Sequence, residues 1–231
     1  MKKSEARVSC IIPAHNEARH ISSVLMVLKD HPLLAEVIVV NDGSTDETAR
    51  IVKQFSFVTL INLFHNYGKA YAVWYGAHQA KKDTVMLLDA DLIGLTQQHV
   101  VRLLRPVLDN DVDATMSIRR LPTILDMFII AFKVDPITGD RCLSKELLLN
   151  LPITKETPGY ALEPMINDYM LLHQLRIGCV NFRDVCGLPK TDKVGYLQGI
   201  RNEVRMFQEI SLKRMLPQYI QLIARRVYIA S

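Results

Sequence analysis

Two carboxylates, Asp89 and Asp91, stand one residue apart directly after the apolar run Val85–Leu88. Because alternate residues at a strand end point the same way, both side chains can converge on one cation. Hard oxygen ligands of this kind suit Mg²⁺ or Mn²⁺. Two further pairs with the same spacing lie within Asp109–Asp113, but they follow no apolar strand. We therefore place the candidate metal ligands at Asp89 and Asp91, while a solvated turn before a helix stays the alternative.

Polar turns follow two other apolar runs. Asn41–Thr45 reads NDGST and contains Gly43, which can take a positive φ while the backbone amides of a starting helix face a ligand. Ala14–Glu17 reads AHNE and has the same polar character. Each turn could do no more than cap the next helix, as Asn16 would. Three polar loops after three strands of one sheet nevertheless favour a ligand site.

The elements that must position these residues alternate between strands and helices. Four short apolar segments are predicted strands, and each is followed by apolar residues at helical spacing: Val8–Pro13, Glu36–Val40, Val58–Leu63 and Thr84–Leu88. Ser44 and Glu47 have capping-box spacing for the second helix, and Thr96 is the predicted cap of the fourth. This order predicts an α/β fold with a mostly parallel sheet flanked by helices, which binds ligands at the carboxyl ends of its strands.

The second half of the chain is less regular, because prolines punctuate it. It contains a predicted strand, a short helix, a longer helix and another strand: Asp113–Arg120, Ser144–Asn150, Leu162–Leu175 and Arg176–Val185. From about Tyr196 the pattern turns helical to the end of the chain. Since neither a repeat nor a linker divides the sequence, we expect one domain over residues 1–231.

Four motifs occur in an order and spacing typical of one enzyme family: Ile11–Glu17 (IIPAHNE), Val37–Thr48 (VIVVNDGSTDET), Gly68–Ala77 (GKAYAVWYGA) and Met86–Leu92 (MLLDADL). Through them, residues 8–95 resemble the family 2 glycosyltransferases. The resemblance implies a GT-A-type nucleotide-binding sandwich, a nucleotide-diphospho-sugar donor, a divalent metal and inversion of the anomeric centre. It divides the domain into a nucleotide-sugar-binding half, 1–118, and an acceptor-binding half with C-terminal helices, 119–231.

The resemblance also implies roles for individual residues of the first half. Pro13, Ala14 and Glu17 would line the nucleoside, and Asp42 would contact its base. Lys69 would lie near the same pocket. Asp89 would face the ribose or the metal, and Asp91 would be the principal metal ligand, bridging to the diphosphate. The alternative for Lys69 is a solvated residue in the first turn of a helix.

Two segments of the second half, Thr138–Leu148 and Gly159–Asp168, resemble the acceptor side of the family. We expect Glu163 to be the catalytic base that takes the proton of the acceptor hydroxyl, with Asp140 as the next choice. The alternative is that Glu163 only opens a helix, where the helix dipole favours an acid. Many relatives carry a metal-binding His after the late strand, but Asp184–Ile200 contains none. Without this His, either water takes its position in the metal shell, or this chain binds the metal more weakly than its relatives do.

The motifs do not identify the acceptor. Leu121–Phe132 is unusually apolar and follows Arg119 and Arg120, which fits a polyprenyl phosphate or another phosphorylated or lipid acceptor; a buried helix is the alternative. Leu212–Ile229 carries one apolar side among basic residues. Such a helix could lie on an anionic membrane or pack against the domain or a second subunit. Peripheral membrane contact and a homodimer both stay open.

Composition limits the other classes of partner and location. The formal net charge is +4 and no cluster of Lys and Arg marks a nucleic-acid footprint, so we expect no nucleic-acid partner. The four cysteines form no CxxC pair, which fits a reducing cytoplasm. The first apolar run stops at Pro13, too early for a signal peptide, and Met127–Phe132 is too short to span a membrane. We expect a cytoplasmic protein, with any membrane contact peripheral.

We therefore predict an inverting, metal-dependent glycosyltransferase that uses a UDP-sugar in preference to other nucleotide-sugars. A sugar-phosphate nucleotidylyltransferase shares the nucleotide-binding sheet and the metal, but its glycine-rich, Arg-containing loop after the first strand is missing here. A non-catalytic nucleotide-binding subunit of a glycan-assembly complex is the alternative from another class, because the metal-binding His is absent. Both acids of the Asp89 and Asp91 pair are present, which favours the enzyme.

Overall fold

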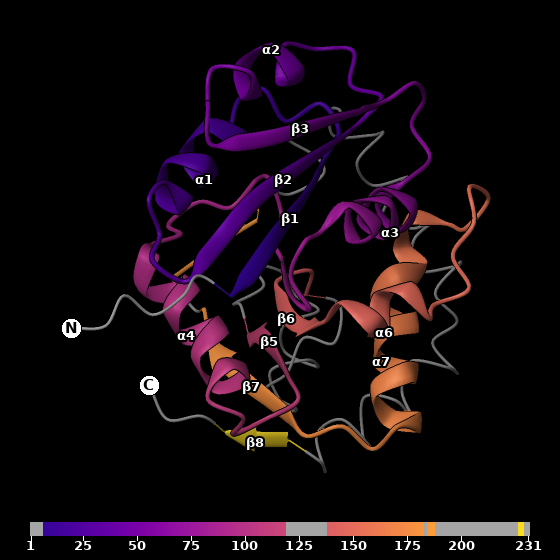
Figure 1. Cartoon of the computed structure of the whole chain (residues 1–231). Coiled ribbons are helices and arrows are strands. Elements are labelled where there is room, and N and C mark those ends of the chain that lie inside the picture. Colours follow the sequence, from indigo (N-terminus) through magenta and orange to yellow (C-terminus); the bar gives the residue numbers. More distant parts are fainter. Residues whose placement is uncertain (1–6, 119–137, 183, 188–225, 229–231) are drawn as a thin grey trace, which may run out of the picture.

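Figure 1 shows the computed structural model of the chain, which describes residues 7–118, 138–182, 184–187 and 226–228. Their strands form an eight-stranded sheet with the order β3-β2-β1-β4-β6-β5-β7-β8. The strands are β1 Val8–Ala14, β2 Leu34–Asp42, β3 Val58–Leu63, β4 Thr84–Leu87, β5 Ala114–Ile118, β6 Arg141–Ser144, β7 Ile177–Asn181 and β8 Arg226–Tyr228. β6 runs antiparallel to β4 and β5, and the other pairings are parallel. The predicted α/β fold with a mostly parallel sheet is confirmed.

Helices cover both faces of this sheet. They are α1 Ile21–Leu28, α2 Thr48–Val52, α3 Lys69–Gln79, α4 Gln97–Leu108, α6 Lys145–Leu149 and α7 Leu162–Leu172, with a 3₁₀ turn, η1, at Gly159–Ala161. Side chains of α1, α2 and α4 share one hydrophobic core with Cys10 and Ile12 of β1, whereas α3, α6 and α7 share the other with Ile11. Alternate residues of β1 therefore serve opposite faces, and Figure 1 shows the helical layers on the two sides.

The start of α2 differs from the sequence prediction. The capping box predicted for Ser44 and Glu47 is wrong, because α2 begins at Thr48 and Glu47 makes no side-chain capping bond. The Ser44 hydroxyl instead accepts a hydrogen bond from the backbone N–H of Asn16 at 3.0 Å. Because α2 begins four residues after Ser44, the Ser44 hydroxyl is not at the helix start and instead links this loop to the loop after β1.

The predicted helical C-terminus is wrong at Arg226–Tyr228, which forms β8 and pairs in parallel with β7. Val227 and Tyr228 belong to the β-branched and aromatic types that favour strands, and an available sheet edge decides the conformation of so short a segment. The rest of the predicted C-terminal helix lies outside the described residues, as do Arg119, Arg120 and Leu121–Phe132. Among the described residues, no helix is long and apolar enough to cross a membrane.

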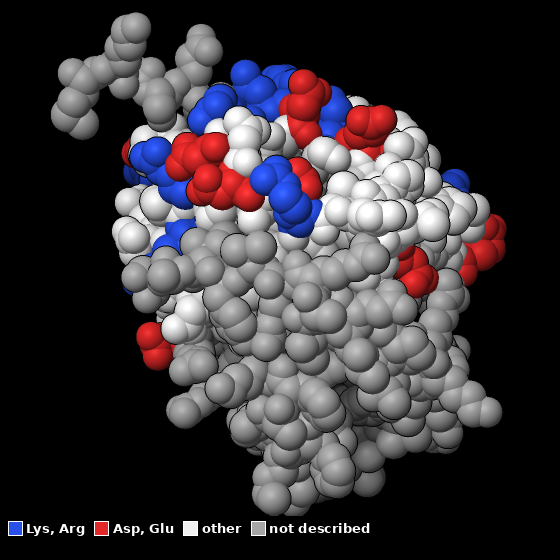
Figure 2. All heavy atoms as spheres, turned by 90° about the horizontal axis from the view of Figure 1, so that it is seen from below, with Lys and Arg blue, Asp and Glu red and all other residues white. Residues whose placement is uncertain are grey.

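The charges on the described surface are mixed. Figure 2 shows Lys and Arg side chains lying among Asp and Glu side chains on the described part of the face that it draws. Arg176 and Asp113 are one ion pair of the surface, with Arg176 Nη2 donating to Asp113 Oδ1 at 2.8 Å. The expectation that nucleic acid is not a partner stays a prediction.

Candidate active site

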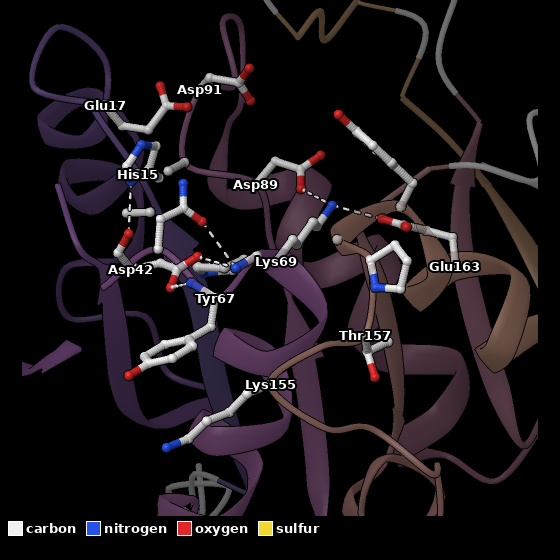
Figure 3. A pocket seen from close by; sticks show the side chains of 18 of the residues that line it. His15, Glu17, Asp42, Tyr67, Lys69, Asp89, Asp91, Lys155, Thr157 and Glu163 are labelled. Atoms are coloured by element: carbon white, nitrogen blue, oxygen red, sulfur yellow. Dashed lines mark hydrogen bonds and ion pairs between the residues drawn. The ribbon is translucent and has the colours of Figure 1, made fainter. Parts of the chain in front are cut away.

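A cleft of about 990 Å³ opens at the carboxyl ends of β1, β2 and β4. One wall comes from the loops that follow the first four strands, and the opposite wall comes from residues 155–160 and the start of α7 (Figure 3). Eight of the nine predicted site residues line it: Pro13, Ala14, Glu17, Asp42, Lys69, Asp89, Asp91 and Glu163. Asp140 is not among the lining residues. The acidic pair and both polar turns therefore gather at one edge of one sheet.

The loops after β1 and β2 are tied to each other. The side-chain oxygen of Asn16 accepts a hydrogen bond from the backbone N–H of Thr45 at 2.9 Å, and the backbone N–H of Glu17 donates to the Thr48 hydroxyl at 2.8 Å. Asn16 itself adopts a positive φ of 56°. The alternative in which Asn16 only caps the next helix is wrong, because the N-cap of α1 is His20. These bonds hold the first two motifs as one rigid rim.

His15 is a cleft residue that the sequence prediction missed. Its Nδ1 lies 2.7 Å from the backbone carbonyl oxygen of Asp42, and its Nε2 lies 3.2 Å from the side-chain nitrogen of Asn16. A carbonyl can only accept, so Nδ1 carries the proton and Nε2 accepts from the Asn16 amide. The tautomer of His15 is thereby set by its two neighbours, and the ring stands fixed in the cleft wall.

Asp42 holds the loop between β3 and α3. Its two carboxylate oxygens accept hydrogen bonds from the backbone N–H groups of Tyr67 and Gly68, each at 2.8 Å. Gly68 has a φ of 91°, a conformation that glycine adopts without steric cost. A Cβ added to Gly159 on the opposite wall would lie 3.2 Å from the Lys69 backbone nitrogen. The two walls therefore meet backbone to backbone beside Asp42.

Lys69 joins the two halves of the site. Its ammonium lies 2.7 Å from Asp89 Oδ1 and 2.8 Å from Glu163 Oε1, as Figure 3 shows. Burial lowers the pKa of Lys69, but the charges of Asp89 and Glu163 outweigh burial, so the pKa lies above its ordinary value. Lys69 therefore stays protonated, and the alternative of a merely solvated residue is wrong.

The four acids differ in their access to the cleft. Asp91 and Asp89 are half-buried on the loop after β4, and the Glu163 side chain is 5% exposed at the start of α7. Asp140 is fully buried, and its Oδ1 accepts a hydrogen bond from the Asp89 backbone N–H at 3.3 Å. The structure thus brings Glu163 to the cleft and keeps Asp140 behind it.

Asp91 and Asp89 supply the oxygen ligands that a divalent cation could use. The described residues contain no cluster of three or more His, Cys, Asp or Glu side chains arranged to hold a metal ion. Mg²⁺ and similar hard cations commonly take one or two carboxylates and complete their shell with substrate phosphates and water. The donor set fits a cation held in that way by Asp91, since Asp89 Oδ1 already contacts Lys69.

Residues 155–158 of the second wall lie outside every segment singled out from the sequence. Lys155 Nζ lies 5.2 Å from the centre of the Tyr67 ring, so a cation–π contact links the two walls at the mouth of the cleft. Tyr67, Lys155 and Tyr160 all line the cleft, and the prediction named none of them. Their shared role depends on a contact between segments almost ninety positions apart, which local patterns do not encode.

Comparison with known proteins identifies the family. The family model described as Glycosyl transferase family 2 matches residues 9–124. The chain belongs to glycosyl transferase family 2. A dolichyl-phosphate beta-glucosyltransferase, ALG5D of Trichomonas vaginalis, is 32% identical over 122 residues, which cover 45% of this chain and 37% of that protein. A 4,4'-diaponeurosporenoate glycosyltransferase of Staphylococcus aureus is 33% identical over 102 residues, covering 42% and 27%. The matched region thus spans about a third of these family 2 relatives.

Solved structures show the same fold over most of the chain. Glucosyl-3-phosphoglycerate synthase from Mycobacterium tuberculosis, crystallised with Mn²⁺, UDP and glucosyl-3-phosphoglycerate, superposes with a TM-score of 0.73 at 24% identity. The match covers 94% of this chain and 81% of that one. A second structure of the same enzyme, with Mn²⁺ and UDP-glucose, gives a TM-score of 0.72 at 25% identity, with 92% and 80% covered. The GT-A fold expected for a family 2 member is confirmed.

Proposed function

We propose that this family 2 glycosyltransferase moves a sugar from a nucleotide-diphospho-sugar to an acceptor hydroxyl with inversion at the anomeric carbon. One observation carries the proposal: Glu163 from the second half of the chain and Asp89 from the first contact the same ammonium, Lys69, inside one cleft. In this proposal Asp89 serves the donor and Glu163 serves the acceptor, and Lys69 holds the two acids close together. This is the arrangement that a direct displacement between two bound substrates needs.

The donor is a UDP-sugar in this proposal. Pro13, Ala14, Glu17 and Asp42 line the cleft, and the nucleoside would lie against them, with the acids Asp89 and Asp91 on the loop after β4. Support comes from the Mycobacterium tuberculosis synthase, whose structures contain Mn²⁺ with UDP or UDP-glucose. Asp91 would hold the Mg²⁺ or Mn²⁺ ion, with Asp89 beside it. When bound, the ion supplies positive charge that offsets the charge of the departing diphosphate.

Glu163 is the base of the proposed reaction. The acceptor oxygen attacks C1 of the sugar, the bond from C1 to the diphosphate oxygen breaks, and the hydroxyl proton moves to the Glu163 carboxylate. The first turn of α7 fixes the direction of this side chain, and its 5% exposure keeps bulk water away from it. Lys69, by contacting Glu163, keeps the carboxylate aimed into the cleft.

The acceptor is a phosphorylated or lipid molecule in this proposal, with polyprenyl phosphate as the leading candidate. The relative from Trichomonas vaginalis is a dolichyl-phosphate glucosyltransferase, and the one from Staphylococcus aureus acts on diaponeurosporenoate. Both names describe lipid acceptors, which support peripheral membrane contact. A homodimer is compatible with the same chemistry and stays a proposal.

A screen of nucleotide-sugar hydrolysis tests the proposed function without knowledge of the acceptor. The full chain is incubated with UDP- and GDP-sugars in Mn²⁺ or in chelator, and release of nucleoside diphosphate is followed. We expect slow, metal-dependent hydrolysis of at least one UDP-sugar. Metal-independent nucleotide binding with no hydrolysis of any donor would instead support a non-catalytic nucleotide-binding subunit.

A further inference from the structure

A buried polar segment, Thr138–Arg141, lies behind the cleft. It contacts the loop that carries Asp89 on one wall and the helix that carries Glu163 on the other. Asp140 within it is fully buried. One of its oxygens accepts from the Asp89 backbone N–H at 3.3 Å, and the other accepts from the Ser117 hydroxyl at 3.0 Å. The Ser117 hydroxyl in turn lies 2.5 Å from the Thr138 hydroxyl. A buried carboxyl group with several such partners is a rigid anchor, because moving it would leave buried polar atoms without hydrogen bonds.

Gly139 leaves room for the ion pair in front of it. A Cβ added at this position would lie 2.4 Å from both Asp89 Oδ1 and Lys69 Nζ. Atoms without a covalent bond between them do not approach so closely, so any side chain at position 139 would displace the carboxylate or the ammonium. The backbone of the segment therefore packs directly against the two charged groups that define the centre of the cleft.

Arg141 connects the same segment to α7. Its side chain is 1% exposed, its Nε donates to the Thr138 carbonyl at 2.9 Å, and its Nη1 donates to Asn167 Oδ1 at 2.7 Å. Asn167 follows Glu163 by four residues, one helical turn further along α7. The segment is thus hydrogen-bonded both to the helix that carries Glu163 and to the loop that carries Asp89.

We propose that Thr138–Arg141 is a positioning element that sets the separation of Asp89 and Glu163, with Asp140 as its anchor and Gly139 as the gap that admits the ion pair. The proposal rests on the proposed function, because the separation matters only if the two acids serve one transfer reaction. Asp140 is accordingly a positioning residue, since it is enclosed behind the cleft and does not line it.

Ser117→Ala tests the anchor with little disturbance, because it removes one hydroxyl bonded to Asp140. Thr115→Val is the matched control: Thr115 is two residues away on β5, faces the same side, and donates to the Leu103 carbonyl at 2.6 Å. Two quantities are measured on the full chain. They are hydrogen exchange of the Asp89 amide by ¹⁵N NMR, and kcat and KM for nucleotide-sugar hydrolysis.

We expect Ser117→Ala to speed exchange of the Asp89 amide and to lower kcat about 10- to 100-fold with KM unchanged, the scale of loss that small misplacements cause. Thr115→Val should change neither quantity. Asp140→Asn, which keeps one acceptor oxygen, should give a kcat loss no smaller than that of Ser117→Ala.

Unchanged exchange in Ser117→Ala, or an equal loss of kcat in Thr115→Val, would overturn the positioning role. A wild-type protein that hydrolyses no nucleotide-sugar would contradict the proposed function instead. In that case exchange at the Asp89 amide still decides whether the segment holds Asp89.

Discussion

At the scale of single residues, the motifs predicted most of the residues that line the cleft, because three of the four motifs lie at the ends of strands of the same sheet and the fourth opens α3. Asp42, Asp89 and Asp91 could be placed from the sequence, since the carboxyl ends of parallel strands meet at one edge. The ion pairs of Lys69 could not be predicted from the sequence, because Glu163 lies on a helix 94 positions away. His15 was missed for a related reason: its role depends on the backbone carbonyl of Asp42, which no side-chain pattern reveals.

Replacing Glu163 separates binding from chemistry. Glu163→Gln keeps the size and a hydrogen-bonding oxygen for Lys69 but cannot take a proton. We expect transfer to fall by about 10²- to 10⁴-fold, the usual contribution of a positioned base, while UDP binding changes little. Transfer kinetics and UDP calorimetry measure the two effects.

Glu146→Gln is the control for that substitution, since Glu146 is exposed on α6 and does not line the cleft. It should leave both quantities unchanged. If Glu163→Gln retains wild-type transfer, Glu163 is not the base.

At the scale of elements, predictions succeeded where local and tertiary preferences agreed. The cap predicted at Thr96 is confirmed, because the Thr96 hydroxyl and the His99 side chain form a reciprocal capping box on α4. The box predicted at Ser44 failed because α2 begins only at Thr48, and the Ser44 hydroxyl bonds the neighbouring loop. β6 was missed within the predicted acceptor segment, since four residues are too few to show alternation and its partners come from β4 and β5.

The capping box on α4 predicts a measurable stability cost. Thr96→Ala should lower the free energy of unfolding by about 1 kcal/mol, because the backbone N–H of His99 loses its acceptor. Urea denaturation followed by circular dichroism measures the change. Thr96→Ser keeps the oxygen and serves as the control, so an equal loss in both variants would show that the cap is not the cause.

At the scale of the whole molecule, one sheet contains strands from both halves of the chain. We therefore propose that residues 1–231 fold as a single unit, with the cleft at the boundary between the two halves. The sequence could predict the sheet for the first half, where strands and helices alternate regularly. It could not predict how the second half joins, because β6 enters antiparallel between β4 and β5.

The buried His31 makes the stability of this unit depend on pH. His31 is 4% exposed, and its Nε2 has no hydrogen-bond partner in the part of the chain that the structure describes. Burial lowers its pKa below the ordinary 6.5, although the nearby backbone of Gln97 opposes part of the shift. The unfolded chain then binds the proton more readily, so stability falls as the pH drops below about 6.5.

His31→Asn removes this titration and keeps an acceptor for the Leu33 backbone N–H, which now bonds to His31 Nδ1. We expect Tm to fall between pH 7 and pH 5 in the wild type and to fall less steeply in the variant. Some slope should remain, because burial also lowers the pKa of His99. Thermal unfolding across this range measures the difference, and parallel curves for the two proteins would contradict the assignment to His31.

We propose that the cleft binds a nucleoside diphosphate through a divalent cation held by Asp91. Calorimetric titration of UDP, with and without Mn²⁺, tests this binding in the wild type, in Asp91→Asn and in Asp109→Asn. Asp109→Asn is the control, because Asp109 is an exposed acid that lies outside the cleft and belongs to a pair spaced like Asp89 and Asp91. We predict that Mn²⁺ tightens UDP binding at least about tenfold, or roughly 1.4 kcal/mol, in the wild type and in Asp109→Asn, and has no effect in Asp91→Asn. Equal affinity for UDP in all three proteins, with or without Mn²⁺, would contradict it.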